Sequence, residues 1–244
     1  MKSQSDINVS PTHPVMFSYR RCPYAMRARI GIYLCQQQVE QREIVFWDKP
    51  EMMVKASPKG TVPVLLLSDG TVIDESRDIL YWAIQQSATE ASLYPLNKRK
   101  QIDALIDFND DEFKEWLDRY KYADRYPEAS QQYYRQKGEV FFSELETLLV
   151  NQTFLTGDEL SLADIALMPF IRQFAHVDKV WFESAEYPKL GGWLNYLMNE
   201  PFFKAVMKNR PVWELGHQPL WVDEPELMTR DQFSAKAQSK SREV

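Results

Sequence analysis

The sequence predicts a chain in two parts, an α/β half followed by an all-α half. In residues 1–87, short β-rich apolar runs alternate with apolar residues at helical spacing. From residue 97 onward, the apolar residues recur at helical spacing. Asp69-Gly70 joins two β-rich runs, which is a strong hairpin signal. We therefore expect an α/β domain over 1–87, an all-α domain over 97–215 and a C-terminal extension over 216–244.

The first half is expected to form the order strand, helix, strand, hairpin, helix. The expected elements are a strand at Val15 to Tyr19, a helix from Pro23, a strand at 41–46, a short helix at 50–56, a hairpin of 61–67 and 71–73, and a helix after Ser76. Pro63 cannot donate a ladder hydrogen bond, so it opens its strand or lies on an edge, and its peptide bond is a candidate for the cis form.

The second half shows helix signals after a linker at 87–96. Ser161 to Asp164 form a capping-box pattern, in which a serine and an acidic residue three positions later satisfy each other's backbone groups. Pro188 and Pro201 are each expected to open a helix. In the tail, the apolar side chains of Trp213, Leu220 and Trp221 are expected to pack on the helical bundle.

Composition narrows the function. With 44% apolar and 26% charged residues, the 244-residue chain has the composition of an ordinary globular protein. The formal charge of −6 and the lack of a basic stripe argue against nucleic acid as a partner. We expect no membrane span, no secretory signal and no metal site. Two cysteines give no disulfide framework, so a reducing cytoplasm is the expected location.

Cys22 is the strongest candidate for chemistry. It stands where the first strand gives way to a helix, and Pro23 suits the first helical position because its missing N–H has no intrahelical partner there. The thiol is therefore expected to face free N–H groups and the positive end of the helix dipole. Arg20, Arg21 and Arg27 are close in sequence. Such surroundings lower a thiol pKa and produce a nucleophilic thiolate.

The alternative is that Cys22 is a small buried apolar residue, as free cysteines often are. Cys35 lies on the same predicted helix, far from its start, and we expect it in the core. Neither cysteine has a partner at Cys-x-x-Cys spacing, so the resolving thiol must come from a small molecule. Arg27 and Lys59 are expected to be surface or electrostatic residues.

Several motifs in this order resemble the cytosolic glutathione S-transferases. They are Cys22-Pro23-Tyr24-Ala25, Thr61-Val62-Pro63-Val64-Leu65, Asp74-Glu75-Ser76 and Ser161-Leu162-Ala163-Asp164. Lys49-Pro50-Glu51 and the cysteine motif are similar to those of the cysteine-type, omega-like class. The resemblance covers residues 14–210 and implies a thioredoxin-like first domain followed by a glutathione-transferase-type helical bundle.

The resemblance also implies a function and a site. It assigns Cys22 the thiol that forms a mixed disulfide with glutathione, in a thiol transferase or reductase that takes a small electrophilic or disulfide substrate and forms a homodimer. Lys49, the backbone of Val62, Glu75 and Ser76 would bind glutathione. Pro63 would be a structural cis proline, and Glu75 and Ser76 are equally explained as helix-capping residues.

Two other functions remain open at this point. Tyr19 or Ser18, near the end of the first strand, would be the catalytic hydroxyl of an enzyme that conjugates glutathione to electrophiles. The fold would otherwise serve as a non-catalytic interaction scaffold. Trp116 and Tyr120 are candidates for a second-substrate pocket, although aromatic residues at helical spacing are more often core.

Overall fold

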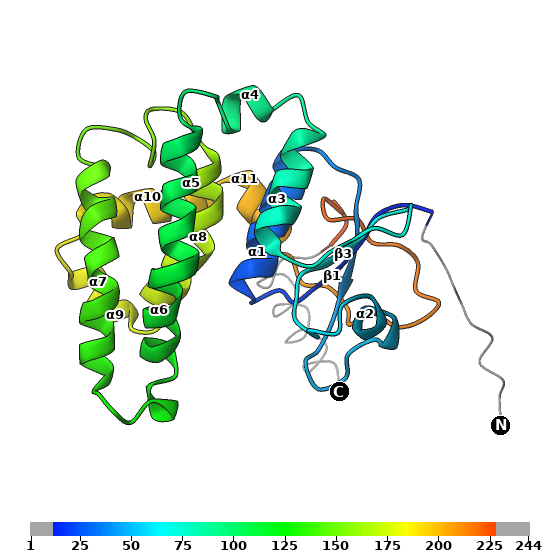
Figure 1. Ribbon diagram of the computed structural model, residues 1–244, viewed down its shortest axis with the longest axis horizontal. Coiled ribbons are helices and arrows are strands. Elements are labelled where there is room, and N and C mark those ends of the chain that lie inside the picture. The colour runs from blue at the N-terminus through cyan, green and yellow to red at the C-terminus, as the bar shows by residue number, and fades with distance from the viewer. Residues whose placement is uncertain (1–11, 228–244) are drawn as a thin grey trace, which may run out of the picture. The chain divides into compact units, whose positions relative to one another are not determined.

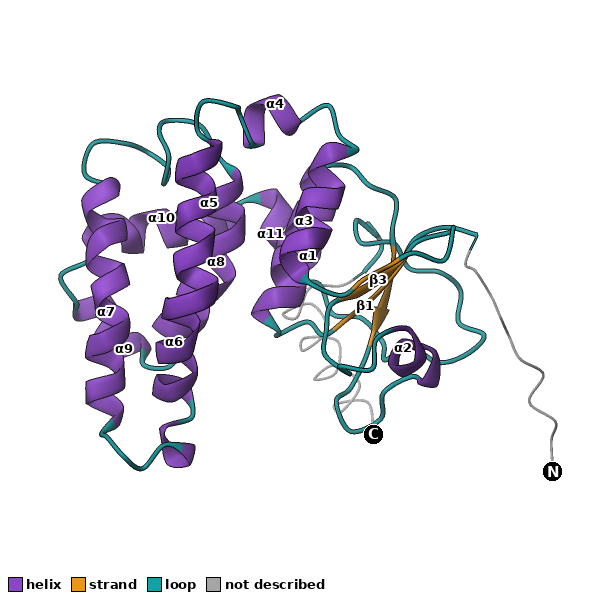
Figure 2. Cartoon of the chain, in the orientation of Figure 1, coloured by secondary structure: helices purple, strands orange, loops and turns teal. Residues whose placement is uncertain are grey.

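The computed structural model describes residues 12–227 (Figure 1). They form two compact units. The first consists of the residues up to Ala83 together with those from Ala205 onward, and the second spans Ile84–Lys204. All the strands lie in the first unit, whereas the second is built from helices and loops (Figure 2). The predicted fold class, a thioredoxin-like domain followed by a helical bundle, is confirmed.

The first unit contains a mixed four-stranded sheet. Its strands are β1 (Val15–Ser18), β2 (Glu40–Glu43), β3 (Val64–Leu66) and β4 (Val72–Ile73), in the order β2-β1-β3-β4. The β1–β2 pair is parallel, and the β1–β3 and β3–β4 pairs are antiparallel. All four residues of β1 are buried, so the central strand is apolar on both faces apart from Ser18.

Three helices cover this sheet. They are α1 (Pro23–Leu34), α2 (Glu51–Ala56) and α3 (Ser76–Gln85). In Figure 1, α1 and α3 lie side by side on one face of the sheet and α2 lies on the other. The close approach of α1 to α3 depends on Gly31, because a Cβ there would come within 2.3 Å of Leu80 Cδ1.

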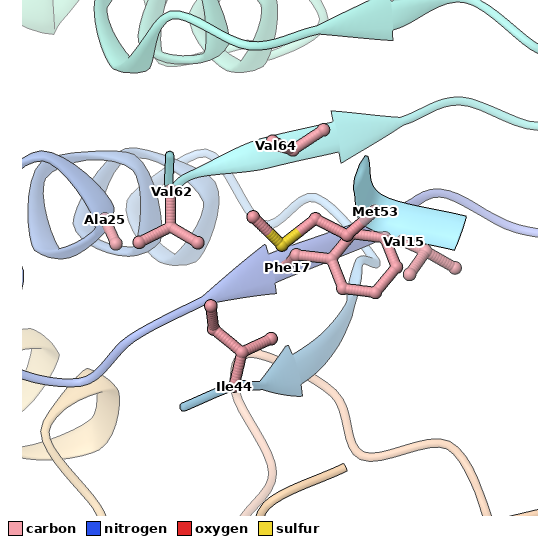
Figure 3. Packing of buried hydrophobic residues seen from close by; sticks show 7 residues of the cluster. All are labelled: Val15, Phe17, Ala25, Ile44, Met53, Val62 and Val64. Atoms are coloured by element: carbon pink, nitrogen blue, oxygen red, sulfur yellow. The ribbon is translucent and has the colours of Figure 1, made fainter. Parts of the chain in front are cut away.

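A cluster of seven buried apolar residues joins α2, the sheet and the start of α1 (Figure 3). Its members are Val15, Phe17, Ala25, Ile44, Met53, Val62 and Val64. Because Ala25 and Val62 belong to the cluster, the first turn of α1 and the segment before β3 pack on the same apolar core. This packing fixes where the two segments meet.

The tail of the chain returns to the first unit and closes the edge of β2. We call residues 205–222 the C-terminal strap. It is joined to the β2 region by the hydrogen bonds Trp213 N–H to Glu43 C=O (2.8 Å), Gln41 N–H to Leu220 C=O (2.7 Å) and Val222 N–H to Val39 C=O (3.0 Å). These bonds satisfy backbone groups that an open edge strand would leave to solvent or to another chain.

The strap overturns the expectation that its aromatic residues pack on the helical bundle. The Trp213 ring meets Phe17 edge-on at 6.4 Å and lies 4.4 Å from the Arg42 guanidinium. Trp221 packs edge-on against His13 at 4.9 Å. That expectation was wrong because the strap forms hydrogen bonds along the outer edge of β2. This pairing holds Trp213 and Trp221 beside the sheet.

The second unit is helical. Its helices are α4 (Glu90–Leu93), α5 (Arg99–Phe108), α6 (Lys114–Lys121), a 3₁₀ turn at Ala123–Arg125, α7 (Gln131–Leu148), α8 (Leu162–Ala175), α9 (Lys179–Ser184) and α10 (Pro188–Asn199), and α11 (Pro201–Val206) leads into the strap. A π-helical turn at Asn109–Phe113 joins α5 to α6. The segment predicted as a linker contains α4, while Pro188 and Pro201 open helices as predicted. Among residues 12–227, every helix is too short or too polar to cross a membrane.

The predicted capping box begins α8. Asp164 is buried, and its carboxylate accepts hydrogen bonds from Ser161 N–H (2.9 Å) and Ser161 Oγ (2.6 Å). It also accepts from Leu155 N–H (2.9 Å) and Trp193 Nε1 (2.8 Å). Burial raises the pKa of Asp164, and these four donors act against that rise. The carboxylate therefore ties the start of α8 to α10 and to the preceding loop.

An aromatic core fills the space between α6, α7 and α8. Phe174 lies 4.7 Å from Tyr120 and 4.8 Å from Phe142 between ring centroids. Gly138 of α7 makes room for this ring, because a Cβ at that position would lie 2.3 Å from Phe174 Cε2. A glycine is therefore needed at position 138 because of the packing of Phe174, and not because of the backbone conformation.

Replacing Gly138 with alanine is expected to lower the free energy of unfolding by about 1–3 kcal/mol, since the added methyl overpacks a buried ring. Gly192, inside α10, is the matched control because a Cβ there meets no atom within 4 Å. Gly192→Ala should raise stability by about 0.5–1 kcal/mol through helix propensity alone. Urea denaturation measures both, and equal effects from the two substitutions would contradict the packing argument.

His176, at the end of α8, makes the stability of the protein depend on pH. Burial, with the positive charges of Arg172 and Lys179, lowers its pKa to about 4. An unfolded histidine binds its proton near about pH 6.5. Between these values the unfolded chain binds more protons, so the free energy of unfolding should fall as the pH is lowered from 7 to 5.

His176→Gln should make this decline shallower, as measured by urea denaturation at several pH values. Measurement at pH 8, where the histidine is neutral in both states, isolates the effect of the substitution on packing from its effect on proton binding. A decline between pH 7 and 5 identical to that of the parent protein would contradict the assignment.

Candidate active site

Cys22 is the N-cap residue of α1, as the sequence predicts. Its backbone is extended (φ −74°, ψ 124°), Pro23 occupies the first turn, and that turn contains no acidic residue. The side chain is half-buried and packs against the apolar cluster of Figure 3. Its N–H donates to the carbonyl of Tyr19 at 3.0 Å. The sulfur therefore stands at the positive end of a 12-residue helix.

The carbonyl of Val62 faces this sulfur. Cys22 Sγ donates to Val62 O at 3.6 Å, and the Val62–Pro63 peptide bond is cis, as expected for this position. The Val62 side chain lies beside Ala25 of α1 (Figure 3). The structure thus brings together Cys22 and Val62, which are 40 residues apart in the sequence.

Ser76 is the first residue of α3, and its hydroxyl lies against a buried charge. Arg27 donates to Ser76 Oγ from Nη2 (2.8 Å) and Nε (3.2 Å). Both residues are buried, and the Arg27 side chain is only 1% exposed. Arg27, expected to be a surface or electrostatic residue, is not at the surface: it lies on the face of α1 that meets α3, where Ser76 accepts its hydrogen bonds.

Glu75 is exposed and belongs to a small charged group beside Ser76. Its carboxylate accepts from Lys59 Nζ at 2.6 Å, and the same ammonium reaches Asp74 at 3.0 Å. Hydrogen bonds from Ser57 and then Lys59 lower the pKa of Asp74, and those to Glu75 and Asp74 raise the pKa of Lys59. Lys59, expected to be a surface or electrostatic residue, therefore pairs with the carboxylates at the start of α3.

Lys49 is half-buried and reaches the turn before Val62. A Cβ on Gly60 would lie 3.3 Å from Lys49 Nζ, and Gly60 has φ +60°, a conformation that favours glycine. The Lys49 ammonium therefore lies beside the turn that leads to Val62.

The two hydroxyls considered as alternatives to Cys22 have different surroundings. Ser18 is fully buried, and its Oγ accepts from Arg29 Nη1 at 2.6 Å, which argues against Ser18 as the catalytic hydroxyl. Tyr19 is half-buried and packs against the same apolar cluster as Cys22. Its hydroxyl accepts from Arg21 Nη2 at 2.9 Å.

Arg29 is a residue of this region that sequence reasoning missed. It is 0% exposed and donates to atoms of Ser18, Tyr19 and Arg20. Burial lowers its pKa, whereas the negative charges of Glu43 and Cys22 act to raise it. The available signal was a charged residue at an otherwise apolar position of α1, between Ala28 and Ile30.

The second unit holds the two aromatic candidates for substrate binding. Tyr120 is 2% exposed, and its ring packs on Phe174, which favours its interpretation as a core residue. Trp116 is half-buried, with the Arg119 guanidinium 5.9 Å from its ring. A role for Trp116 in substrate binding stays a prediction.

Comparison with known proteins identifies the family of the chain. The family model for the glutathione S-transferase N-terminal domain matches residues 16–91, and the model for the C-terminal domain matches residues 94–201. Glutathione S-transferase U28 of Arabidopsis thaliana is 25% identical over 187 residues, covering 73% of this chain and 81% of that protein. Glutathione S-transferase AN1595 of Emericella nidulans is 27% identical over 217 residues, covering 82% of this chain and 78% of that protein.

Solved structures support the fold. The glutathione transferase URE2P6 from Phanerochaete chrysosporium, in complex with oxidized glutathione, superposes with a TM-score of 0.69 at 16% identity, covering 78% of this chain and 93% of that one. Glutathione transferase Omega 3C from Trametes versicolor gives a TM-score of 0.67 at 18% identity, covering 79% and 88%. The chain belongs to the glutathione S-transferase superfamily, whose enzymes use glutathione as a co-substrate.

Ser76→Ala is expected to lower the free energy of unfolding by about 1–3 kcal/mol, because the buried guanidinium of Arg27 loses an acceptor. Ser184→Ala is the control, since that hydroxyl is exposed and bonds only to carbonyls of its own helix. Its effect should stay within about 0.5 kcal/mol. If urea denaturation finds the two variants equally stable, Ser76 does not satisfy Arg27.

Proposed function

We propose that this glutathione transferase is a thiol transferase or reductase of the cysteine-type, omega-like class. The observation that carries the proposal is the position of Cys22 Sγ at the start of α1, 3.6 Å from the carbonyl of Val62. The helix dipole at this position favours a thiolate, whose formation gives up the hydrogen bond that the thiol donates to Val62. Cys35, the other cysteine, is buried in the core as expected, so it offers no internal resolving thiol.

The reaction takes two exchanges. The Cys22 thiolate attacks the glutathione sulfur of a mixed disulfide, forms the Cys22–glutathione disulfide and releases the substrate as a thiolate. A second glutathione thiolate then attacks the glutathione sulfur of that disulfide. A disulfide bond forms between the two glutathione sulfurs and the bond to Cys22 breaks. Oxidised glutathione leaves, and the Cys22 thiolate is regenerated.

Glutathione binding is assigned to the groups around the sulfur. The backbone of Val62 would pair with the cysteinyl part of glutathione, as an added strand does. Ser76, at the start of α3, would bind the γ-glutamyl carboxylate through its hydroxyl and the free N–H groups of the helix. Glu75 would pair with the α-amine, and Lys49 with a carboxylate. Because Lys59 already neutralises Glu75 in part, glutathione would share that carboxylate with it.

We infer the remaining features from the same family. The second substrate is a small electrophile or disulfide, the protein is a homodimer, and the reducing cytoplasm keeps both cysteines in the thiol form. Neither Cys22 nor Cys35 belongs to a disulfide in the structure.

A conjugating transferase that uses Tyr19 is the second candidate. It is favoured by the position of Tyr19 against the same apolar cluster as Cys22, with a hydroxyl held by Arg21. In such an enzyme the tyrosine would stabilise the thiolate of glutathione itself, and Cys22 would play no part.

Replacing Cys22 with serine separates the two candidates. The reduction of the mixed disulfide of glutathione and 2-mercaptoethanol should fall roughly a thousandfold or more, because serine forms no disulfide. Intact-mass analysis should find one glutathione on the parent protein, and none on the variant, after exposure to oxidised glutathione.

Cys35→Ala is the control and should retain both the activity and the adduct. Undiminished disulfide reduction in the Cys22→Ser variant would contradict the proposal. Persistence of conjugation alone, lost in Tyr19→Phe, would favour the second candidate.

A further inference from the structure

Arg29 donates hydrogen bonds to the segment of chain that leads to Cys22. Its Nη2 donates to the carbonyl of Arg20 at 2.7 Å, and its Nη1 donates to Ser18 Oγ at 2.6 Å and to the carbonyl of Tyr19 at 3.3 Å. One guanidinium thus binds three consecutive residues, from the last residue of β1 into the loop before α1. A guanidinium can bind several acceptors at once because its donors have a planar, fixed arrangement, whereas a lysine ammonium has no such fixed geometry.

One of these acceptors is shared with Cys22 itself. The carbonyl of Tyr19 accepts from Arg29 Nη1 and also from the N–H of Cys22, at 3.0 Å. A shift of Arg29 would therefore move the carbonyl on which the backbone of Cys22 depends. The loop is held from the other side by Glu43, whose Oε1 accepts from Arg20 N–H at 2.5 Å.

Arg29 also binds the C-terminal strap. Its Nε donates to the carbonyl of Val206 at 3.2 Å, and Nη2 lies 3.8 Å from the sulfur of Met207. The same side chain therefore contacts the strap and the loop before the thiol. These interactions leave the guanidinium without any exposed surface.

The charges around Arg29 are few. Glu43 of β2 and Cys22 interact with it as negative charges, while Arg20 and, from the strap, Arg210 interact with it as positive ones. Because this guanidinium is buried, water screens its charge less than it would at the surface, and Cys22 is among the groups whose charge interacts with it.

We propose that Arg29 is a positioning residue, which holds the backbone of residues 18–20 in place beneath Cys22 and supplies a buried positive charge that favours the thiolate. The proposal rests on the function proposed above, because it concerns the thiol of that reaction. It assigns to Arg29 the electrostatic role that the sequence suggested for Arg20, Arg21 and Arg27.

The test measures the rate at which iodoacetamide alkylates Cys22 as a function of pH, by intact mass, in a Cys35→Ala background. In Arg29→Met, the midpoint of the profile should rise by about one pH unit, since an opposite charge has been removed. In Arg29→Lys, the midpoint should stay near that of the parent while turnover falls, because the charge remains but fewer hydrogen bonds hold the loop.

Two further variants exclude a merely structural effect. Glu43→Gln keeps an acceptor for Arg20 N–H but removes the negative charge beside Arg29, so its midpoint should not rise. Arg99→Gln removes an arginine that likewise donates to a backbone carbonyl, that of Tyr94, and should leave the profile unchanged. Far-UV circular dichroism verifies folding, and if Arg29→Met is unfolded, the turnover of Arg29→Lys decides: turnover equal to that of the parent protein would overturn the role of Arg29.

The outcomes separate the two proposals. A parent midpoint near that of a free cysteine, about 8.5, would overturn the proposed function itself. A low parent midpoint that is unchanged in Arg29→Met would overturn the role of Arg29 and leave the proposed function standing. A rise in Glu43→Gln as large as that in Arg29→Met would also overturn it, because loop packing alone would then explain both.

Discussion

The first unit depends on the need to satisfy two buried guanidinium groups of α1. Arg27 and Arg29 are 1% and 0% exposed, and burying such a charge is costly unless hydrogen-bond acceptors surround it. Arg27 finds Ser76 at the start of α3, and Arg29 finds the backbone between β1 and α1. The same hydrogen bonds therefore hold the helix start, the loop before it and α3 around the sulfur.

Much of the site was predictable because its residues lie at the ends of elements. Cys22, Pro63 and Ser76 stand where local patterns change, and the structure places Cys22 near Val62 and Ser76 against α1. Arg27 and Arg29 were not predictable in this way, since their roles depend on what packs against α1. Arg29 and Val206 are 177 residues apart, and no local pattern links them.

The helical unit is held together by other means. Its aromatic rings pack around Phe174, and the carboxylate of Asp164 gathers four donors at the start of α8. The capping box was predictable because both partners lie within one turn of helix. The ring packing was predictable only as a stripe of apolar residues, because the partner of each ring is set by how the helices pack on one another. This is why Tyr120 left two interpretations open.

The C-terminal strap has a consequence for the order in which the protein is made. A ribosome releases β1, α1 and β2 before the helical unit, but the segment that closes the edge of β2 and binds Arg29 emerges only after that unit. The helical unit is a continuous stretch and contains its own core, so it has all its parts first. The thiol-bearing unit is therefore begun before the helical unit and completed after it. Until the strap is made, the edge of β2 has no hydrogen-bond partner there and Arg29 lacks the carbonyl of Val206.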